Sequence, residues 1–386
     1  MSKDPLYYNL SLINGFNSSQ SLSPSVIEEN NNQVVVENGT QLYMTIGRFS
    51  IPASTIPQLI VPVVLGQADI NKTQYSIQFK LCTGLNTFNE SFTQSLSVPF
   101  ISQYPLLSSI TKPPLISQDI NNSYYWIYDI EQIILMFNNA FKSLFATFCA
   151  QVGLPFAYNP LYFPYITFDF NTRLFSINLT ANDGAINYFD QNTGAFPFIV
   201  CNINNIAYNL FQLTTINYLP PYAIKSNYFY TFSCFNKYDN KIVSGGITEY
   251  KMTASISSLN LWSALNKIII SVGYGISTKL EYDSIPVDNQ STTNQNAVNK
   301  PTLPILTDFE VDRDAYSING NWIQYQTSNI TQQRLVALTS DQIKNFQLSC
   351  YWLDNFGIRH ILELDKGLPL TIKLCFYDKN MKLINF

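Results

Sequence analysis

Acid–base chemistry in this 386-residue chain would have to rely on scattered carboxylates, because the sequence contains a single histidine, His360. One histidine excludes metal sites and proton relays built from several of them, and no nucleophile elbow is present for a serine triad. His360 directly follows Arg359 in an expected hairpin. We therefore expect His360 at the surface rather than in a catalytic role.

Five carboxylates are candidates for the paired acid and base of a glycoside hydrolase. These are Asp169, Glu249, Glu281, Asp308 and Glu310. Asp308 and Glu310 are two positions apart, so in a strand both side chains point to the same side of the sheet. Carboxylates are also common at strand ends, and Arg334 and Lys373 are available as their partners. Structural ion pairs are therefore the simpler interpretation.

No stretch of the sequence predicts a cofactor or a metal site. Gly273-Tyr274-Gly275 lacks the third glycine and the following helix of a dinucleotide fingerprint, and no phosphate loop occurs. The cysteines form no CxxC pairs, so we expect free buried thiols rather than disulfides or zinc ligands. They are Cys82, Cys149, Cys201, Cys234, Cys350 and Cys375.

Aromatic runs are the pattern in this chain that could bind a sugar by stacking. They occur at 124–126 and again between 158 and 165. The same rings could instead pack a helix onto its neighbours or line contacts between subunits, and packing is the simpler interpretation. A carbohydrate-binding or glycan-hydrolysing protein therefore stays as the alternative function.

The low charge content indicates the broad class of protein. Only 12% of the residues are charged, 46% are hydrophobic and the net charge is −4. This composition supplies a large core, and without a basic cluster we expect no direct nucleic-acid binding. The N-terminus lacks the pattern of a signal peptide. Gly153 and Pro155 interrupt one long uncharged run, from Ser143 to Phe168, so we expect no membrane span there.

Alternation of apolar and polar residues predicts antiparallel strands over most of the chain. The pattern is clearest at Phe346–Trp352 and at Leu370–Phe376, with Asn, Asp and Gly turns between them. One long helix interrupts the strands. It is expected to begin after Asp129, a suitable N-cap, because apolar residues then recur at helical spacing as far as Phe148.

The expected fold is mainly β: a single jelly-roll β-sandwich with a large mixed α/β insertion domain. The strands before the helix and those at the end of the chain are each too few for a sandwich, and pairing the two sets resolves both shortages. In a jelly roll the first and last strands lie side by side. The predicted parts are an N-terminal arm at 1–32, the jelly roll at 33–118 and 245–386, and the insertion domain at 119–244.

Short motifs in the C-terminal third occur in a recognisable order. They are LPILTDFE from Leu303, RLVAL from Arg334, YWLD from Tyr351 with Gly357 after it, LDKG from Leu364 and IKLCF from Ile372. In this order the chain resembles the minor capsid (penton) proteins of virophages and of polinton-like viruses. The resemblance covers residues 245–386 well and the first half by length and order alone.

The resemblance implies a structural protein without enzymatic activity. Five copies would form the pentamer at each vertex of an icosahedral virion, held by trimers of the major capsid protein after assembly in the host cytoplasm. The insertion would face outward, where it could bind a glycan of a host or giant-virus surface. A major capsid protein, a further alternative, usually needs two jelly rolls per chain. The resemblance also implies positions that hold the fold: Asp308, Phe309, Glu310, Arg334, Trp352, Gly357, Gly367, Lys373 and Phe376.

Overall fold

The computed structural model describes most of the chain in short stretches. The described residues are 5–14, 22–30, 34–62, 72–84, 87–99, 124–152, 162–180, 182–183, 186–187, 198–211, 229–232, 240–244, 247–278, 280–283, 302–310, 322–326, 334–355, 357 and 359–380. The chain divides into two compact units. We call Met1–Gln58 with Ser263–Phe386 the jelly-roll unit, and Leu59–Trp262 the insertion unit.

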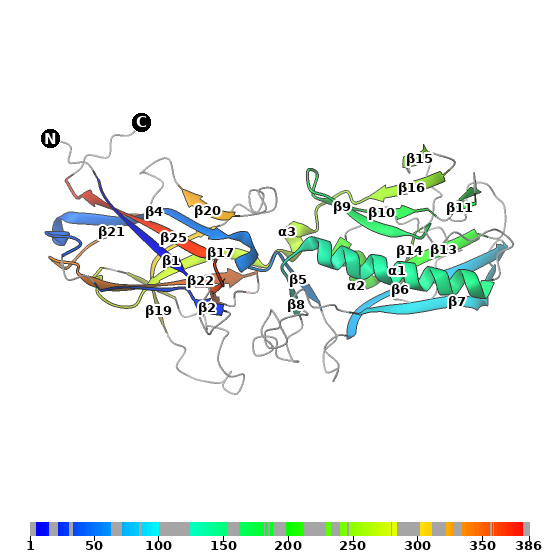
Figure 1. Cartoon of the computed structure of the whole chain (residues 1–386), viewed down its shortest axis with the longest axis horizontal. Coiled ribbons are helices and arrows are strands. Elements are labelled where there is room, and N and C mark those ends of the chain that lie inside the picture. Colours follow the sequence, from blue (N-terminus) through cyan, green and yellow to red (C-terminus); the bar gives the residue numbers. More distant parts are fainter. Residues whose placement is uncertain are drawn as a thin grey trace. The chain divides into compact units, whose positions relative to one another are not determined.

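Two antiparallel sheets make up the jelly-roll unit (Figure 1). The first has the order β1 (Leu6–Ile13), β25 (Pro369–Asp378), β4 (Leu42–Pro52), β20 (Trp322–Gln326), with β21 (Val336–Ala337) also on β4. The second has the order β18 (Glu281–Asp283), β19 (Leu303–Glu310), β17 (Leu265–Val272), β22 (Asn345–Asp354), β23 (Arg359–Ile361), with β3 (Val26–Asn30) also on β22. Short strands β2 (Leu22–Pro24) and β24 (Glu363–Asp365) pair separately, and two 3-10 turns lie at Gly39–Gln41 and Ala53–Thr55.

The strand order identifies the fold as a jelly roll. Setting aside the short strands, eight remain in chain order: β1, β3, β4, β17, β19, β20, β22 and β25. One sheet then reads first, eighth, third, sixth, and the other reads second, seventh, fourth, fifth. Two interlocked Greek keys produce this order. The predicted pairing of the first strand with the last is confirmed, with Leu10 opposite Ile372.

The predicted N-terminal arm at 1–32 is wrong for the residues described there. β1 and β3 are full members of the two sheets, and they bury Leu10 and Ile27 in the core. Tyr8, Leu10 and Leu12 do alternate with the polar Asn9 and Ser11, as a strand requires. The many Ser and Asn residues around these short strands obscured that signal.

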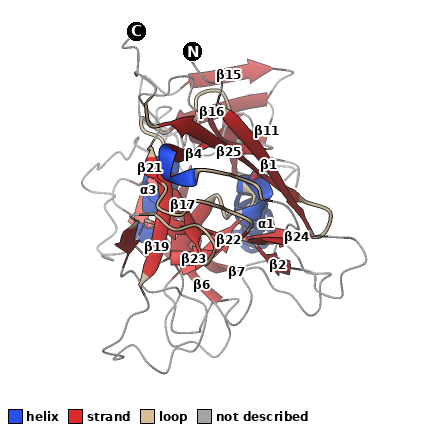
Figure 2. Cartoon of the chain, turned by 90° about the vertical axis from the view of Figure 1, so that its left-hand side faces the viewer, coloured by secondary structure: helices blue, strands red, loops and turns tan. Residues whose placement is uncertain are grey.

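The insertion unit combines further sheets with helices. One sheet has the order β15 (Asn240–Ser244), β16 (Ile247–Thr253), β10 (Leu174–Leu179), β9 (Tyr165–Asp169), and another the order β14 (Phe229–Phe232), β13 (Phe198–Asn204), β6 (Lys72–Gly84), β7 (Thr87–Pro99). Two-stranded sheets form from β5 (Leu59–Pro62) with β8 (Tyr124–Ile127) and from β11 (Asn182–Asp183) with β12 (Ile186–Asn187). The helices are α1 (Ile130–Val152), α2 (Asn205–Phe211) and α3 (Leu259–Trp262). Figure 2 colours the strands red and shows how much of the described chain they make up.

The insertion is larger than the sequence predicted, since it spans Leu59–Trp262 rather than 119–244. β6 and β7, assigned to the jelly roll from their alternation, belong to the insertion because β6 pairs with β13. At the other boundary β16 pairs with β10. Alternation shows that a segment is a strand but not which strand it pairs with. The insertion therefore lies between the third and fourth strands of the jelly roll.

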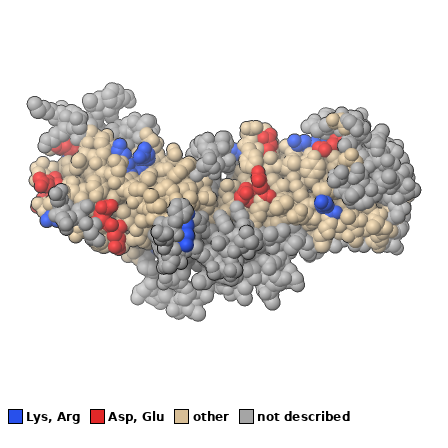
Figure 3. All heavy atoms as spheres, viewed as in Figure 1, with Lys and Arg blue, Asp and Glu red and all other residues tan. Residues whose placement is uncertain are grey.

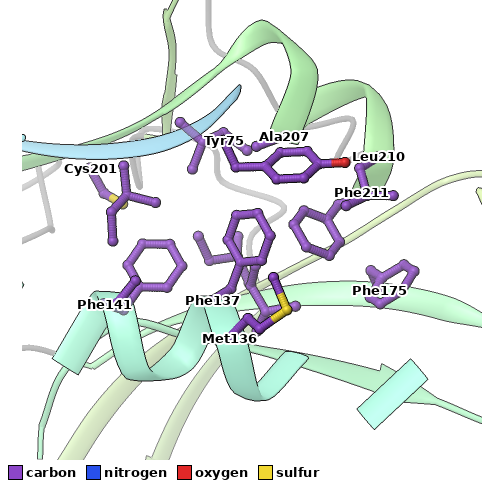
Figure 4. Packing of buried hydrophobic residues seen from close by; sticks show 14 of the residues in the cluster. Tyr75, Met136, Phe137, Phe141, Phe175, Cys201, Ala207, Leu210 and Phe211 are labelled. Atoms are coloured by element: carbon purple, nitrogen blue, oxygen red, sulfur yellow. The ribbon is translucent and has the colours of Figure 1, made fainter. Parts of the chain in front are cut away.

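Helix α1 lies at the centre of the core of the insertion unit. Its predicted N-cap is confirmed, since Asp129 Oδ1 accepts a hydrogen bond from the Glu131 backbone N–H at 3.0 Å. Phe137 on the helix lies 5.4 Å from Tyr75 and 4.7 Å from Phe211, measured between ring centroids, as Figure 4 shows from close by. The helix is long and apolar enough to span a membrane. Its buried face packs against these sheets, so in the structure it is a core helix.

Candidate functional site

Three of the charged residues singled out from the sequence, Glu281, Asp308 and Arg334, meet on the outer face of the second jelly-roll sheet. Asp308 on β19 accepts a hydrogen bond from Lys267 on β17, with 2.6 Å between Nζ and Oδ2. Arg334 lies 3.5 Å from the other oxygen of Asp308 and 2.8 Å from Glu281 on β18. Arg334 is thus confirmed as a carboxylate partner. The network joins three strands and the segment before β21, as a structural ion-pair cluster does.

Lys373 is not part of this network, and its predicted pairing with the carboxylates is wrong. It lies on β25 in the other sheet, where its Nζ is 4.0 Å from the centroid of the Tyr7 ring. In the strand register Lys373 is opposite Arg48 on β4. Asp308 and Lys373 therefore face away from each other across the sandwich, because each points outward from its own sheet.

Asp169 and Glu249 do not form the close pair that a glycoside hydrolase needs. Across β10, Asp169 is opposite Leu174 whereas Tyr250 is opposite Leu179. At about 3.3 Å per residue, the two levels are about 16 Å apart along the strand, and Glu249 lies one residue further. A hydrolase needs about 5–10 Å between its carboxyl groups. Asp169 and Glu249 therefore cannot be the paired acid and base of the alternative function, a glycan hydrolase.

Each of these two carboxylates has a local structural partner. Asp169 accepts the Asn171 backbone N–H at 2.9 Å in the β9–β10 turn, and this hydrogen bond lowers the pKa of the Asp169 carboxyl. Glu249 accepts the Tyr165 hydroxyl at 3.1 Å. Burial, followed by the charge of Glu249, raises the pKa of Tyr165 to about 12. Both contacts tie strands or turns together.

The prediction of a surface position for His360 is wrong. Its exposed fraction is 3%, and its ring stacks on Trp352 with 4.2 Å between centroids. His360 Nε2 lies 2.9 Å from Asp354 Oδ2, and both side chains are buried. The register places His360 directly opposite Trp352 across the β22–β23 hairpin, which carries it into the core. The alternation of residues in the two strands of this hairpin could have predicted that His360 faces inward. The prediction failed because a polar residue is usually assigned to the surface.

Several positions of the family pattern lie within the strands and turns of the jelly-roll unit. Phe309 contacts Phe49 across the two sheets, with 5.3 Å between ring centroids. Phe376 is buried on β25 opposite Met44. Gly357 and Gly367 have positive φ values of 79° and 77°, a conformation that favours glycine. Glu310 is exposed, opposite Lys267 in the strand register.

The cysteines within the described stretches are free and buried, as predicted: Cys82, Cys149, Cys201, Cys350 and Cys375. Burial raises the pKa of the Cys149 and Cys350 thiols to about 12, which suppresses their thiolate forms. Cys234 lies outside the described residues. Within the described part of the chain, no three His, Cys, Asp or Glu side chains are grouped as metal ligands would be.

The aromatic runs are only partly within the described residues. Side chains at 124–126 and residues 158–161 lie outside them. Tyr165 is half-buried and bonded to Glu249, so its ring has a structural role. Phe170, at the tip of the β9–β10 hairpin, is 49% exposed and packs against Phe168. The sequence pattern did not single out Phe170.

Comparison with known proteins identifies a family for this chain. Over residues 6–378 the chain matches the family model of the Sputnik minor capsid protein V18/19. It is 29% identical over 158 residues to the uncharacterized protein V18 of Sputnik virophage, an alignment that covers 39% of this chain and 87% of that relative.

Solved structures show the same fold along the whole chain. A chain of the Sputnik virophage structure solved by cryo-EM superposes with a TM-score of 0.65 at 22% identity, covering 98% of each chain. The mavirus penton protein superposes with a TM-score of 0.53 at 12% identity, covering 97% of this chain and 99% of that one. The predicted resemblance, most like the Sputnik virophage penton protein, is confirmed. The chain belongs to the Sputnik minor capsid protein V18/19 family, and is a structural protein of a virophage-type capsid.

Proposed function

We propose that this protein forms the pentameric vertex of an icosahedral virion. The strand order of a complete single jelly roll carries the proposal, since one such unit per chain suits a ring of five copies at a vertex. The solved relative named as a penton protein shares this fold along its whole length. Trimers of the major capsid protein would surround the ring, which would assemble in the host cytoplasm.

Mass measurement of the purified full-length chain tests the proposal. Mass photometry is expected to show a species of five copies, and cryo-EM of virions is expected to place its density at the vertices. A chain that stays monomeric and is absent from the vertices would contradict the proposal.

The insertion unit is the proposed attachment element, displayed outward from the vertex. The observation that favours it is the β9–β10 hairpin, which carries the exposed Phe170 beside the polar side chains of Asp169 and Asn171. An exposed ring with carboxylate and amide neighbours suits a glycan of a host or giant-virus surface, because sugars stack on aromatic faces and bond to polar groups. Binding of the full-length protein to a glycan array is expected, and Phe170→Ala is expected to abolish it.

Catalysis is not part of the proposed function. Asp308 lies in the ion-pair network with Lys267 and Arg334, and Asp169 and Glu249 are too far apart. Glycans recovered after incubation with the protein are therefore expected to be intact. Release of shortened glycans would contradict this part and favour the hydrolase alternative.

A further inference from the structure

The outer face of the first jelly-roll sheet carries a pair of like charges. Arg48 on β4 is exposed and is opposite Lys373 on β25 in the strand register. Like charges directly opposite each other on a sheet are destabilising. Among the described residues of β1, β25, β4 and β20 the acidic residue is Asp378, five positions after Lys373 and hence on the other side of its strand. This basic face, defined by Arg48 and Lys373, has no acidic partner on these strands.

Exposed apolar side chains flank the two bases on the same face. Tyr7 and Ile13 on β1 are 48% and 59% exposed, and Trp322 on β20 is 40% exposed. Their register partners on β25 and β4 lie an even number of residues from Lys373 or Arg48, so all point the same way. Arginine with exposed aromatic rings is the composition typical of the centre of a protein interface.

The opposite sheet of the same unit presents carboxylates outward. Lys267 and Arg334 lie in the ion-pair network around Asp308. Glu310 and Glu28 are exposed, and Glu28 accepts a hydrogen bond from the neutral amide of Gln347 at 2.9 Å. Glu281 is paired with Arg334, yet its side chain is 75% exposed. We call Glu28, Glu281 and Glu310 the carboxylate face.

Charges are otherwise sparse on this protein, and Figure 3 shows a described surface that is mostly neither acidic nor basic. Two oppositely charged faces on the two sheets of one unit are therefore distinctive. A closed ring requires heterologous contacts, in which each copy offers two different and complementary patches to its neighbours. Both patches are present on this chain.

We infer that the basic face of one jelly-roll unit binds the carboxylate face of the next copy around the ring. The inference rests on the proposed pentamer and names the surfaces that close it. Arg48 and Lys373 would meet Glu310, Glu28 and Glu281 of the neighbour, with Tyr7, Ile13 and Trp322 excluding water around them. Each base would then gain the acidic partner that its own sheet lacks.

Charge reversal at Arg48 separates binding from folding. Within one copy, Arg48→Glu places an acid opposite Lys373, so the thermal unfolding temperature is expected to stay equal or to rise. Between copies the same change opposes two acidic faces, and the dissociation constant of the ring is expected to increase by at least about tenfold. Mass photometry across a concentration series measures the second effect, and a thermal melt measures the first.

A complementary reversal provides the decisive comparison. Glu310→Lys with Glu28→Lys, added to Arg48→Glu with Lys373→Glu, exchanges the two faces and is expected to restore the ring. Lys344→Glu with Lys366→Glu is the matched control, because both lysines are exposed on the same unit but off these faces. Added salt is expected to raise the dissociation constant of the wild-type ring, because it screens the opposite charges. The control variant is expected to show the same salt dependence as the wild type.

Two results overturn the inference in distinguishable ways. A wild-type pentamer that survives Arg48→Glu unchanged overturns the assignment of these faces and leaves the proposed function intact. A wild-type chain that is monomeric at every concentration overturns the proposed pentamer, and this contact with it.

Discussion

The two units of this protein are stabilised by different kinds of core. In the insertion unit the large side chains that are almost completely buried are aromatic, with Phe79 touching the rings of Phe141, Phe145 and Phe148. In the jelly-roll unit the largest such side chain is Arg359, which lies 5.5 Å from the centroid of the Tyr351 ring, and the next residue, His360, forms a buried pair with Asp354. The comparison teaches that the insertion is organised around one helix, whereas the jelly roll relies on distant strand pairings reinforced by buried polar groups.

Removing the Phe79 ring is expected to have the largest effect and to act on the insertion unit. Phe79→Ala removes a fully buried side chain from contact with three rings of α1, so we expect a loss of about 3–5 kcal/mol in free energy of unfolding. Hydrogen exchange measured peptide by peptide in the full chain should show faster exchange between residues 59 and 262, with the jelly roll unchanged.

Phe170→Ala is the matched control for Phe79→Ala, since the same ring is removed from an exposed position. A change within about 0.5 kcal/mol is expected there. Equal acceleration of exchange in both units after Phe79→Ala would show that the two units share one cooperative core, and the comparison would fail.

Removing the His360 side chain is expected to act on the jelly roll in the same way, with a smaller effect. His360→Ala takes the hydrogen-bond partner at 2.9 Å from the buried Asp354 and the stacked ring from Trp352. We expect a loss of about 2–3 kcal/mol, seen in peptides of β22 and β23 and not in the insertion.

His360→Phe separates the two contributions, because it keeps a ring against Trp352 but removes the hydrogen bond to Asp354. If His360→Phe is as stable as the wild type, the buried polar pair contributes nothing to the jelly roll. The contrast between the two cores would then rest on ring packing alone.

The sequence predicted the fold class because the signals for it are local. Alternation marked β22 and β25, and helical spacing with Asp129 marked α1. Pairing is non-local, so the sequence placed the boundaries of the insertion wrongly: an alternating strand such as β6 fits either sheet equally well. Of the two bases predicted to pair with the carboxylates, only Arg334 does so. The prediction failed for Lys373 because the direction of its side chain depends on which sheet its strand joins.

Asn138 offers a test of how α1 is attached to the edge of a sheet. Its side-chain amide accepts the Ile166 backbone N–H at 2.7 Å and donates to the Ile166 carbonyl at 2.9 Å, as a neighbouring strand would. Asn138→Ala is expected to cost about 1–2 kcal/mol and to speed exchange in β9. Asn139→Ala is the control, because Asn139 is exposed on the same helix. Equal effects of the two changes would show that this edge contact is not specific.

Tyr165 and Glu249 give the smallest effect and a defined pH dependence. Tyr165→Phe removes a half-buried hydrogen bond of 3.1 Å, so the loss at neutral pH is expected to be about 0.5–1 kcal/mol. The pKa of Tyr165 is raised from 10.0 to about 12 by burial and by Glu249. The unfolded chain therefore loses this proton first as the pH rises, and the stabilisation is present below pH 10 and lost between pH 10 and about 12. Urea unfolding should show the wild type approaching the Tyr165→Phe variant and then falling below it over that range. Parallel curves would show that the folded chain does not raise the pKa of Tyr165.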